Sequence, residues 1–290
     1  MLGLSQATAQ GPRPMVGQLV CHQANPGEDL VQIASRYRLT VDHLAYANGF
    51  PITTLSVEPG TRVWVPGCRI LPANPPHNGV VINLPERLLF LFRRGRFDGY
   101  YPLSIGDEVA EGGRFQTPTG HFRIIEKLKS PTWYPPAWAK DRTPVPPGPN
   151  NPLGEYWVGL SLPRTGVHGT NDPLNVGNSV THGCMRMYPH LLKEFYDKVG
   201  VGFEARIEYE TSKLGRDAQG RIYLVTFPDV YGKSDPLKRT QALLLQARLR
   251  PVRRNFSDVM GLLLGIPVEV RGHNSVEQEF CQRAGVSESD

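Results

Sequence analysis

The sequence has no continuous apolar run of about 18 residues, the length that a membrane-spanning helix needs. It therefore predicts no helix that crosses a membrane. It also has no stripe of basic residues interleaved with aromatic ones, because Lys and Arg are scattered apart from short pairs such as Arg93-Arg94 and Arg253-Arg254. The net charge of +5 suits contact with anionic polymers, including acidic cell-wall material. Without a basic stripe, however, nucleic-acid binding is disfavoured.

Cysteine is scarce, with four residues in the chain: Cys21, Cys68, Cys184 and Cys281. Cys21 and Cys68 bracket the first small domain, so they are the expected pair if the compartment is oxidising. Cys281 lies in a polar tail and is given no role.

The first nine residues lack the charged region and most of the apolar region of a signal peptide. They do end in Ala7-Thr8-Ala9, the small-x-small pattern of a signal-peptidase site. Residues 1–17 are therefore interpreted as a leader remnant or a disordered tail, which favours export.

Glycine and proline, by contrast, are plentiful, with 30 and 27 residues. Residues 131–152 carry so many prolines that neither a helix nor a central strand is possible there, so this stretch is predicted to be a loop. Residues 68–78 are also Pro-rich and are expected to act as a semi-rigid linker.

Residues 18–67 are predicted to be a small α+β domain with the order strand, helix, helix, strand. Helical spacing is followed by Leu30, Ile33, Ala34 and Tyr37. A second helix is expected over residues 41–47, with Thr40 as its N-cap and Asn48-Gly49 as its stop. A strand over residues 60–66 completes the domain.

Residues 79–210 show many short strands separated by turn residues, which favours a mainly β sandwich or barrel. Strands are expected at 80–84, 87–92, 100–105, 121–125, 156–160 and 203–209. One helix is predicted from Pro189 to Gly200. Residues 211–290 form a C-terminal extension with a strand at 220–227, helical spacing at 239–248 and no evident chemistry.

The stretch SVTHGCMRMYP, residues 179–189, carries the chemistry of the chain. Cys184 fits poorly as a buried small hydrophobe, because its neighbours are polar or tiny. It also fits poorly as a zinc ligand, because His182-x-Cys184 is not a known ligand spacing and no second cysteine is near. As a nucleophile it fits well, since a thiolate attacks carbonyls and its pKa falls beside imidazole and at a helix N-terminus.

The neighbours of Cys184 supply the other parts of an acyl-transfer site. His168 and His182 are available as a base or as electrostatic support. Gly183 allows an unusual backbone conformation, and the Gly183 and Cys184 amides can point at an oxyanion. Arg186 adds a positive charge for a substrate carboxylate or amide oxygen.

The segment from His168 to Met187, HGT followed by THGCMRM, resembles the signature of the L,D-transpeptidase (YkuD-type) catalytic domain. TPTGHF at 117–122 and GRIYLVTFPDVYG at 220–232 resemble the LysM-bearing Gram-negative enzymes of this family. Residues 18–67, with GEDL, IA and AN in order, are similar to a LysM module, a glycan-binding unit. The resemblance implies a mostly β sandwich with a helix supporting the catalytic loop at 79–210, plus a βααβ LysM domain at 18–67.

The resemblance also implies roles for individual residues. Cys184 corresponds to the nucleophile and His168 to the base, with the Gly169 carbonyl orienting the imidazole. His182 is expected to shape the loop rather than transfer protons, and the Gly183 and Cys184 amides to form the oxyanion hole. The residues expected to contact substrate are Arg186, Thr181 (in place of the usual Ser), Tyr156 and Trp133.

The implied reaction is attack on the diaminopimelate carbonyl of a peptidoglycan stem tetrapeptide, release of D-alanine, and transfer of the thioester to an amine. That amine belongs to a neighbouring stem (a 3-3 cross-link) or to a lysine of an outer-membrane lipoprotein. The expected partners are therefore glycan strands and stem peptides in the periplasm or cell wall, and no cofactor or metal is implied. Two alternatives stay open: a hydrolase of the L,D-carboxypeptidase or amidase type with the same Cys-His site, and a non-catalytic wall-binding LysM protein.

Overall fold

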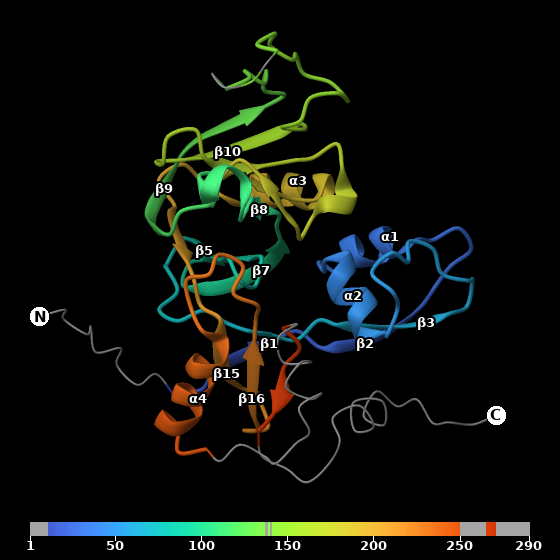
Figure 1. Cartoon of the computed structure of the whole chain (residues 1–290), viewed down its shortest axis with the longest axis vertical. Coiled ribbons are helices and arrows are strands. Elements are labelled where there is room, and N and C mark those ends of the chain that lie inside the picture. The colour runs from blue at the N-terminus through green and yellow to red at the C-terminus, as the bar shows by residue number, and fades with distance from the viewer. Residues whose placement is uncertain (1–10, 137–138, 140, 250–264, 271–290) are drawn as a thin grey trace, which may run out of the picture. The chain divides into compact units, whose positions relative to one another are not determined.

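The computed structural model describes residues 11–136, 139, 141–249 and 265–270 (Figure 1). The chain forms two compact units. The larger unit comprises residues 22–65 and 74–210, and the terminal unit comprises described residues of 11–21, 66–73 and 211 onward.

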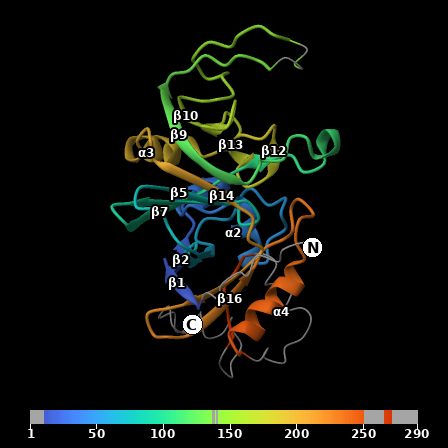
Figure 2. The same ribbon diagram turned by 90° about the vertical axis from the view of Figure 1, so that its left-hand side faces the viewer.

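The larger unit contains an eight-stranded mixed sheet with the order β13-β11-β10-β9-β14-β5-β6-β7. Its strands are β5 (Gly79–Asn83), β6 (Leu88–Arg93), β7 (Arg96–Pro102), β9 (Gly120–Lys129), β10 (Tyr156–Leu160), β11 (Gly166–His168), β13 (Met185–Arg186) and β14 (Glu204–Glu208). All five residues of β5 and the first five of β6 are buried, as in a strand covered on both faces. β9, ten residues long, curves as it crosses the unit (Figure 2).

Shorter elements complete this part of the larger unit. β8 (Ile105–Gly106) pairs with β12 (Ser179–Thr181), and the 3-10 turns are η1 (Ala110–Gly113) and η2 (Pro173–Asn175). Helix α3 (Pro189–Lys198) begins with proline in its first turn, as predicted, and packs against β10. The ring centroids of Tyr156 and Tyr196 are 4.7 Å apart at this contact.

Residues 19–66, of which 22–65 belong to the larger unit, have the expected strand, helix, helix, strand order: β2 (Leu19–Gln23), α1 (Leu30–Arg36), α2 (Val41–Ala47) and β3 (Arg62–Pro66). A capping box between Asp29 and Gln32 starts α1, and Thr40 caps α2 as predicted. The apolar faces of both helices, including Leu30 and Leu44, are fully buried. The two helices pack against each other.

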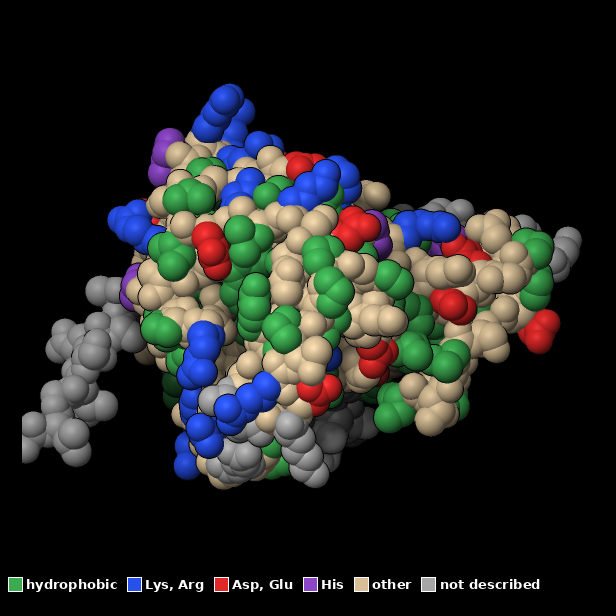
Figure 3. All heavy atoms as spheres, turned by 90° about the horizontal axis from the view of Figure 1, so that it is seen from above, with side chains coloured by type: hydrophobic (Ala, Val, Ile, Leu, Met, Phe, Trp, Pro, Cys, Tyr) green, Lys and Arg blue, Asp and Glu red, His purple; other side chains and the backbone are tan. Residues whose placement is uncertain are grey.

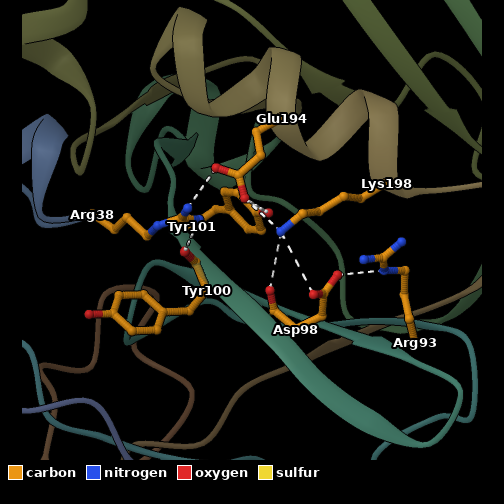
Figure 4. Close-up of polar contacts among 7 residues, drawn as sticks. All are labelled: Arg38, Arg93, Asp98, Tyr100, Tyr101, Glu194 and Lys198. Atoms are coloured by element: carbon orange, nitrogen blue, oxygen red, sulfur yellow. Dashed lines mark hydrogen bonds and ion pairs between the residues drawn. The ribbon is translucent and has the colours of Figure 1, made fainter.

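A polar cluster joins the α1–α2 turn to the sheet and to α3 within this unit (Figure 4). Arg38 Nη2 donates to Glu194 Oε2 at 2.6 Å, and its guanidinium lies 4.9 Å from the Tyr101 ring centroid. The other Glu194 oxygen accepts from Tyr101 at 3.0 Å and from Lys198 at 2.7 Å. Burial alone would raise the pKa of Glu194, but its bonds with Lys198 and Arg38 lower it to about 2. The carboxylate is therefore held ionised by its partners.

The terminal unit is a five-stranded sheet with the order β17-β16-β15-β1-β4. Its elements are β1 (Arg13–Val16), β4 (Arg69–Ile70), β15 (Ser212–Arg216), β16 (Ile222–Thr226), α4 (Pro236–Gln246) and β17 (Val268–Glu269). Two expectations are corrected here, because Arg13–Val16 is a strand rather than a disordered tail and Arg69–Ile70 is a strand within the predicted linker. Both strands pair with each other, which satisfies backbone groups that a free linker would leave to water.

The expected bridge between Cys21 and Cys68 is wrong, because both are free thiols. Cys21 lies in β2, which pairs with β3, whereas Cys68 directly precedes β4, which pairs with β1 in another sheet. Cys281 lies outside the described residues.

No helix among the described residues combines the length and apolarity required to cross a membrane. On the face drawn in Figure 3, basic, acidic and hydrophobic side chains are intermixed.

Candidate active site

The parallel pair β11 and β13 brings the two sequence motifs together. His168 lies opposite Arg186, and Val167 lies opposite Met185. Side chains of paired residues project to one face of a sheet, and so do residues two apart along a strand. If the same alternation extends to Cys184, which directly precedes β13, it predicts that Cys184 shares the face of His168. With a rise of about 3.3 Å per residue and about 4.8 Å between strands, their Cα atoms would then be roughly 8 Å apart.

His168 is buried and its ring orientation is fixed. Its Nδ1 lies 2.7 Å from the carbonyl oxygen of Gly169, so Nδ1 carries the proton and donates it to that oxygen. The Trp157 ring stacks on the imidazole, with 5.9 Å between centroids and 24° between planes. Burial lowers the pKa of His168 to about 4, helped by the Arg186 charge and opposed by the carbonyls of Gly169 and Pro152. The imidazole is therefore neutral at pH 7, with Nε2 as its acceptor nitrogen.

Cys184 is partly exposed, and its thiol donates to the carbonyl oxygen of Arg164 at 3.4 Å. Burial raises the pKa of this thiol, while a bond from the Gly166 amide and the charge of Arg186 act in the opposite direction. The expected lowering of the Cys184 pKa is thus wrong. Helix α3 begins only at Pro189, so Cys184 is not at the helix N-terminus, and a neutral imidazole offers no positive charge.

The THGC turn is held by the hydroxyl of Thr181. This oxygen accepts from the Gly183 amide at 3.2 Å and donates to the Cys184 carbonyl at 2.5 Å. Thr181 is buried, and its predicted contact with substrate stays a prediction. The Gly183 amide, expected in the oxyanion hole, is already bonded within the turn. The unusual backbone expected at Gly183 is present, with φ at +105°.

The other residues predicted for the site differ in their exposure to solvent. His182 is exposed, with its ring centroid 4.4 Å from that of Phe115 in an edge contact. Tyr156 is buried against Tyr196, and its predicted contact with substrate stays a prediction. Trp133 is half-buried, and its backbone pairs with Val145 across the Pro-rich loop. Arg186 is half-buried beside the two reacting groups.

Three residues of the site were not identified from the sequence. Thr117 is fully buried and its Oγ1 donates to the Gly183 carbonyl at 3.1 Å while accepting from the Gly106 amide at 2.9 Å. Trp157 covers His168, and Asn151 holds the adjacent loop. The available signal was the TPTGHF stretch at 117–122, which indicates a motif and gives Thr117 no individual role.

Among the described residues, no group of three or more His, Cys, Asp and Glu side chains is arranged to hold a metal ion. The chemistry that this arrangement can perform with its own groups is attack by sulfur on a carbonyl, assisted by a neutral imidazole.

Comparison with known proteins agrees with this chemistry. Residues 77–207 match the YkuD family, described as the L,D-transpeptidase catalytic domain. YkuD of Bacillus licheniformis is 32% identical over 59% of this chain and 87% of its own length. YbiS of Escherichia coli K12 is 30% identical over 78% of this chain and 72% of its own. YcfS of the same organism is 28% identical over 89% of this chain and 86% of its own. All three carry L,D-transpeptidase in their names.

Solved structures give a weaker likeness. An L,D-transpeptidase from Mycobacterium smegmatis is 18% identical over 53% of this chain and 75% of its own, with a TM-score of 0.37. L,D-transpeptidase 3 of Mycobacterium tuberculosis is 16% identical over 70% of this chain and 96% of its own, with a TM-score of 0.38. The sequence matches alone carry the family assignment. The chain belongs to the L,D-transpeptidase family of the YkuD type.

Proposed function

We propose that this chain is a peptidoglycan L,D-transpeptidase in which Cys184 is the nucleophile and His168 is the base. The observation that carries the proposal is the parallel pairing of β11 with β13, which supports a shared face for both side chains. The bond from His168 Nδ1 to the Gly169 carbonyl leaves Nε2 as the acceptor nitrogen. Family membership supplies the reaction class, and this arrangement supplies the groups that it requires.

The first step forms a thioester. The sulfur of Cys184 bonds to the carbonyl carbon of diaminopimelate in a stem tetrapeptide, while His168 Nε2 takes the thiol proton. Because the thiol and imidazole are both neutral at rest, proton transfer accompanies attack rather than preceding it. The tetrahedral intermediate then expels D-alanine, whose amine nitrogen takes the proton from His168.

The second step uses an amine as the acceptor. Its nitrogen bonds to the thioester carbonyl carbon, its proton passes to His168 Nε2, and the Cys184 sulfur leaves and recovers that proton. The acceptor is the side-chain amine of diaminopimelate in a neighbouring stem or a lysine of an outer-membrane lipoprotein. Stem peptides and such lipoproteins lie outside the cytoplasm, so the proposal requires an exported, wall-associated protein.

The negative charge on the oxygen of the tetrahedral intermediate needs a hydrogen-bond donor that is not already bonded within the THGC turn. The Gly183 amide is bonded to Thr181 Oγ1, so we assign the oxyanion to the Cys184 amide and to the positive charge of Arg186. Arg186 lies beside His168 and is half-buried, where a charge is less screened than in water.

Residues 18–67 are proposed to be a LysM module that binds the glycan strands. The support is its βααβ order and the packing of α1 against α2. Tethering to the polymer raises the local concentration of stem peptides at Cys184. Sedimentation with purified sacculi tests this: loss of co-sedimentation in a protein lacking residues 18–67, with the catalytic part still folded, is the expected result.

The test of catalysis is substitution of the sulfur. We expect Cys184→Ala to abolish D-alanine release from tetrapeptide-rich sacculi while leaving the circular dichroism spectrum unchanged. Intact mass spectrometry after incubation with a tetrapeptide is expected to detect a thioester adduct in the wild type and in Cys68→Ala, the matched control, but not in Cys184→Ala.

Muropeptide analysis then identifies the acceptor. Cross-linked 3-3 dimers or a peptide-linked lipoprotein support transfer. Tripeptides alone, in the presence of added amine, would make the protein a hydrolase. An adduct that persists in Cys184→Ala would remove Cys184 from the mechanism.

A further inference from the structure

Asn151 lies at the base of the Pro-rich loop between β9 and β10, which extends away from the strands in Figure 1. It is 1% exposed, although its neighbour Asn150 is exposed. Its Nδ2 donates to the carbonyls of Pro131, Val145 and Pro146 at 2.8, 3.1 and 3.2 Å. One amide group therefore ties the two arms of this loop together.

The other end of the same side chain leads to the catalytic histidine. Asn151 Oδ1 accepts from the Leu153 amide at 2.9 Å. The Leu153 carbonyl accepts from the Gly169 amide at 2.8 Å. The Gly169 carbonyl accepts from His168 Nδ1 at 2.7 Å. Three hydrogen bonds, linked through the backbones of Leu153 and Gly169, thus connect Asn151 with the imidazole.

Close packing leaves this chain little room to rearrange. A Cβ built on Gly154 would lie 3.1 Å from the Gly169 Cα, and one built on Gly169 would lie 3.2 Å from the Leu153 carbonyl oxygen. The backbones of 153–154 and 169 therefore touch without intervening side chains. A displacement of Leu153 changes the position of the Gly169 carbonyl, the group that holds the His168 proton on Nδ1.

We propose that Asn151 is a positioning residue: it fixes the 151–154 segment so that the Gly169 carbonyl keeps His168 in the tautomer with Nε2 unprotonated. A buried amide side chain that hydrogen-bonds four backbone groups is costly to replace. An imidazole in the other tautomer has its lone pair on Nδ1, away from the thiol, and is inactive as the base. The inference rests on the proposed function of His168.

The test compares Asn151→Ala with Asn150→Ala, an adjacent exposed asparagine. We expect Asn151→Ala to lower kcat by about 10- to 100-fold with KM changed by less than about twofold, because the base is affected rather than substrate binding. Nitrogen-15 NMR of the imidazoles, with the His168 signals assigned from His168→Gln, is expected to give one Nδ1–H tautomer in the wild type and in Asn150→Ala. In Asn151→Ala the Nε2–H tautomer should appear at pH 7.5.

A folded Asn151→Ala protein with an unchanged tautomer and kcat within twofold of the wild type would overturn the proposal. If Asn151→Ala does not fold, Asn151→Asp is measured in the same way, since it keeps an oxygen for the Leu153 amide. It is expected to retain the Nδ1–H tautomer. If neither variant folds while Asn150→Ala does, Asn151 is required for the fold and the proposal fails. The NMR measurement does not depend on catalysis. It therefore tests the role of Asn151 even if the wild type shows no transpeptidase activity, so failure of the proposed function is distinguished from failure of this inference.

Discussion

At the scale of single residues, the resting site contains a neutral thiol and a neutral imidazole. The pKa of His168 is lowered to about 4, and that of Cys184 is raised above its ordinary value. The active form of the free enzyme, with His168 unprotonated, is therefore populated at every pH above about 4. A preformed thiolate–imidazolium pair would instead require the two pKa values to be displaced in the opposite directions.

Because the pKa of His168 is lowered and that of Cys184 is raised, we expect activity over a broad pH range. We expect kcat/KM to fall only as pH drops through about 4, where His168 gains its proton, rather than near the ordinary histidine value of about 6.5. The measurement is D-alanine release from a soluble tetrapeptide between pH 3.5 and 9, with circular dichroism at each pH to establish that the protein remains folded. An acidic limb centred near pH 6.5 would contradict the neutral resting pair.

At this scale the sequence was most informative where chemistry needs a particular residue type. Cys184, His168 and Gly169 could be selected because the motif around them is specific, and the expected contact from His168 to the Gly169 carbonyl is present. Thr117, Trp157 and Asn151 could not be selected, because their contacts join residues far apart in the chain. The hydroxyl of Thr117, for instance, meets a carbonyl 66 positions later.

At the scale of elements, Thr117 connects three segments around the nucleophile. Its hydroxyl links the loop before β9 to Gly106 in β8 and to Gly183 in the catalytic turn. The threonine is fully buried, so water cannot substitute for the hydroxyl without rearrangement. The catalytic turn is thus anchored from outside, as well as by Thr181 from within.

Substitution of Thr117 tests this anchor. Thr117→Val keeps the shape of the side chain and removes two hydrogen bonds, which we expect to lower the free energy of unfolding by about 1–3 kcal/mol. The rate of D-alanine release should also fall, because Gly183 is directly joined to Cys184. Urea denaturation followed by fluorescence measures the stability. Thr117→Ser, which retains the hydroxyl, is the control, and equal stabilities of the Val and Ser variants would show that the hydroxyl does not matter.

Strands and helices long enough to show a hydrophobic period were predictable from the sequence. Very short strands, and pairings between residues far apart in the chain, were not. The strand over residues 156–160 and the helix starting at Pro189 were predicted, because alternation and capping residues are local signals. β11 and β13 were not predicted, since three and two residues are too few to show a period. The five-stranded sheet of the terminal unit was not predicted either, because the pairing of β1 with β15 joins residues about 200 positions apart.

At the scale of the whole molecule, the arrangement within the larger unit depends on contacts such as that between Arg38 and Glu194. Arg38 follows α1 with a positive φ of 58°, a conformation that costs energy for a residue other than glycine. From there it reaches Glu194, the Tyr101 ring and, at 3.4 Å, the Tyr100 carbonyl (Figure 4). Lys198 and Asp98 extend the cluster on the other side of Glu194. The proposed wall-binding segment is thereby fixed to the catalytic part of the same unit.

A double-mutant cycle measures the coupling free energy between Arg38 and Glu194. Arg38→Ala, Glu194→Gln and the double variant are expected to give a coupling of about 1–3 kcal/mol in urea denaturation, because both side chains are about two-thirds buried and share a network. Lys193→Ala is the control on the same helix: its pair with Asp197 is exposed, so its effect should stay below about 0.5 kcal/mol. Arg38→Ala is also expected to speed proteolytic cleavage after residue 65. A coupling no larger than the effect of Lys193→Ala, with unchanged cleavage, would mean that the contact does not restrain the segment.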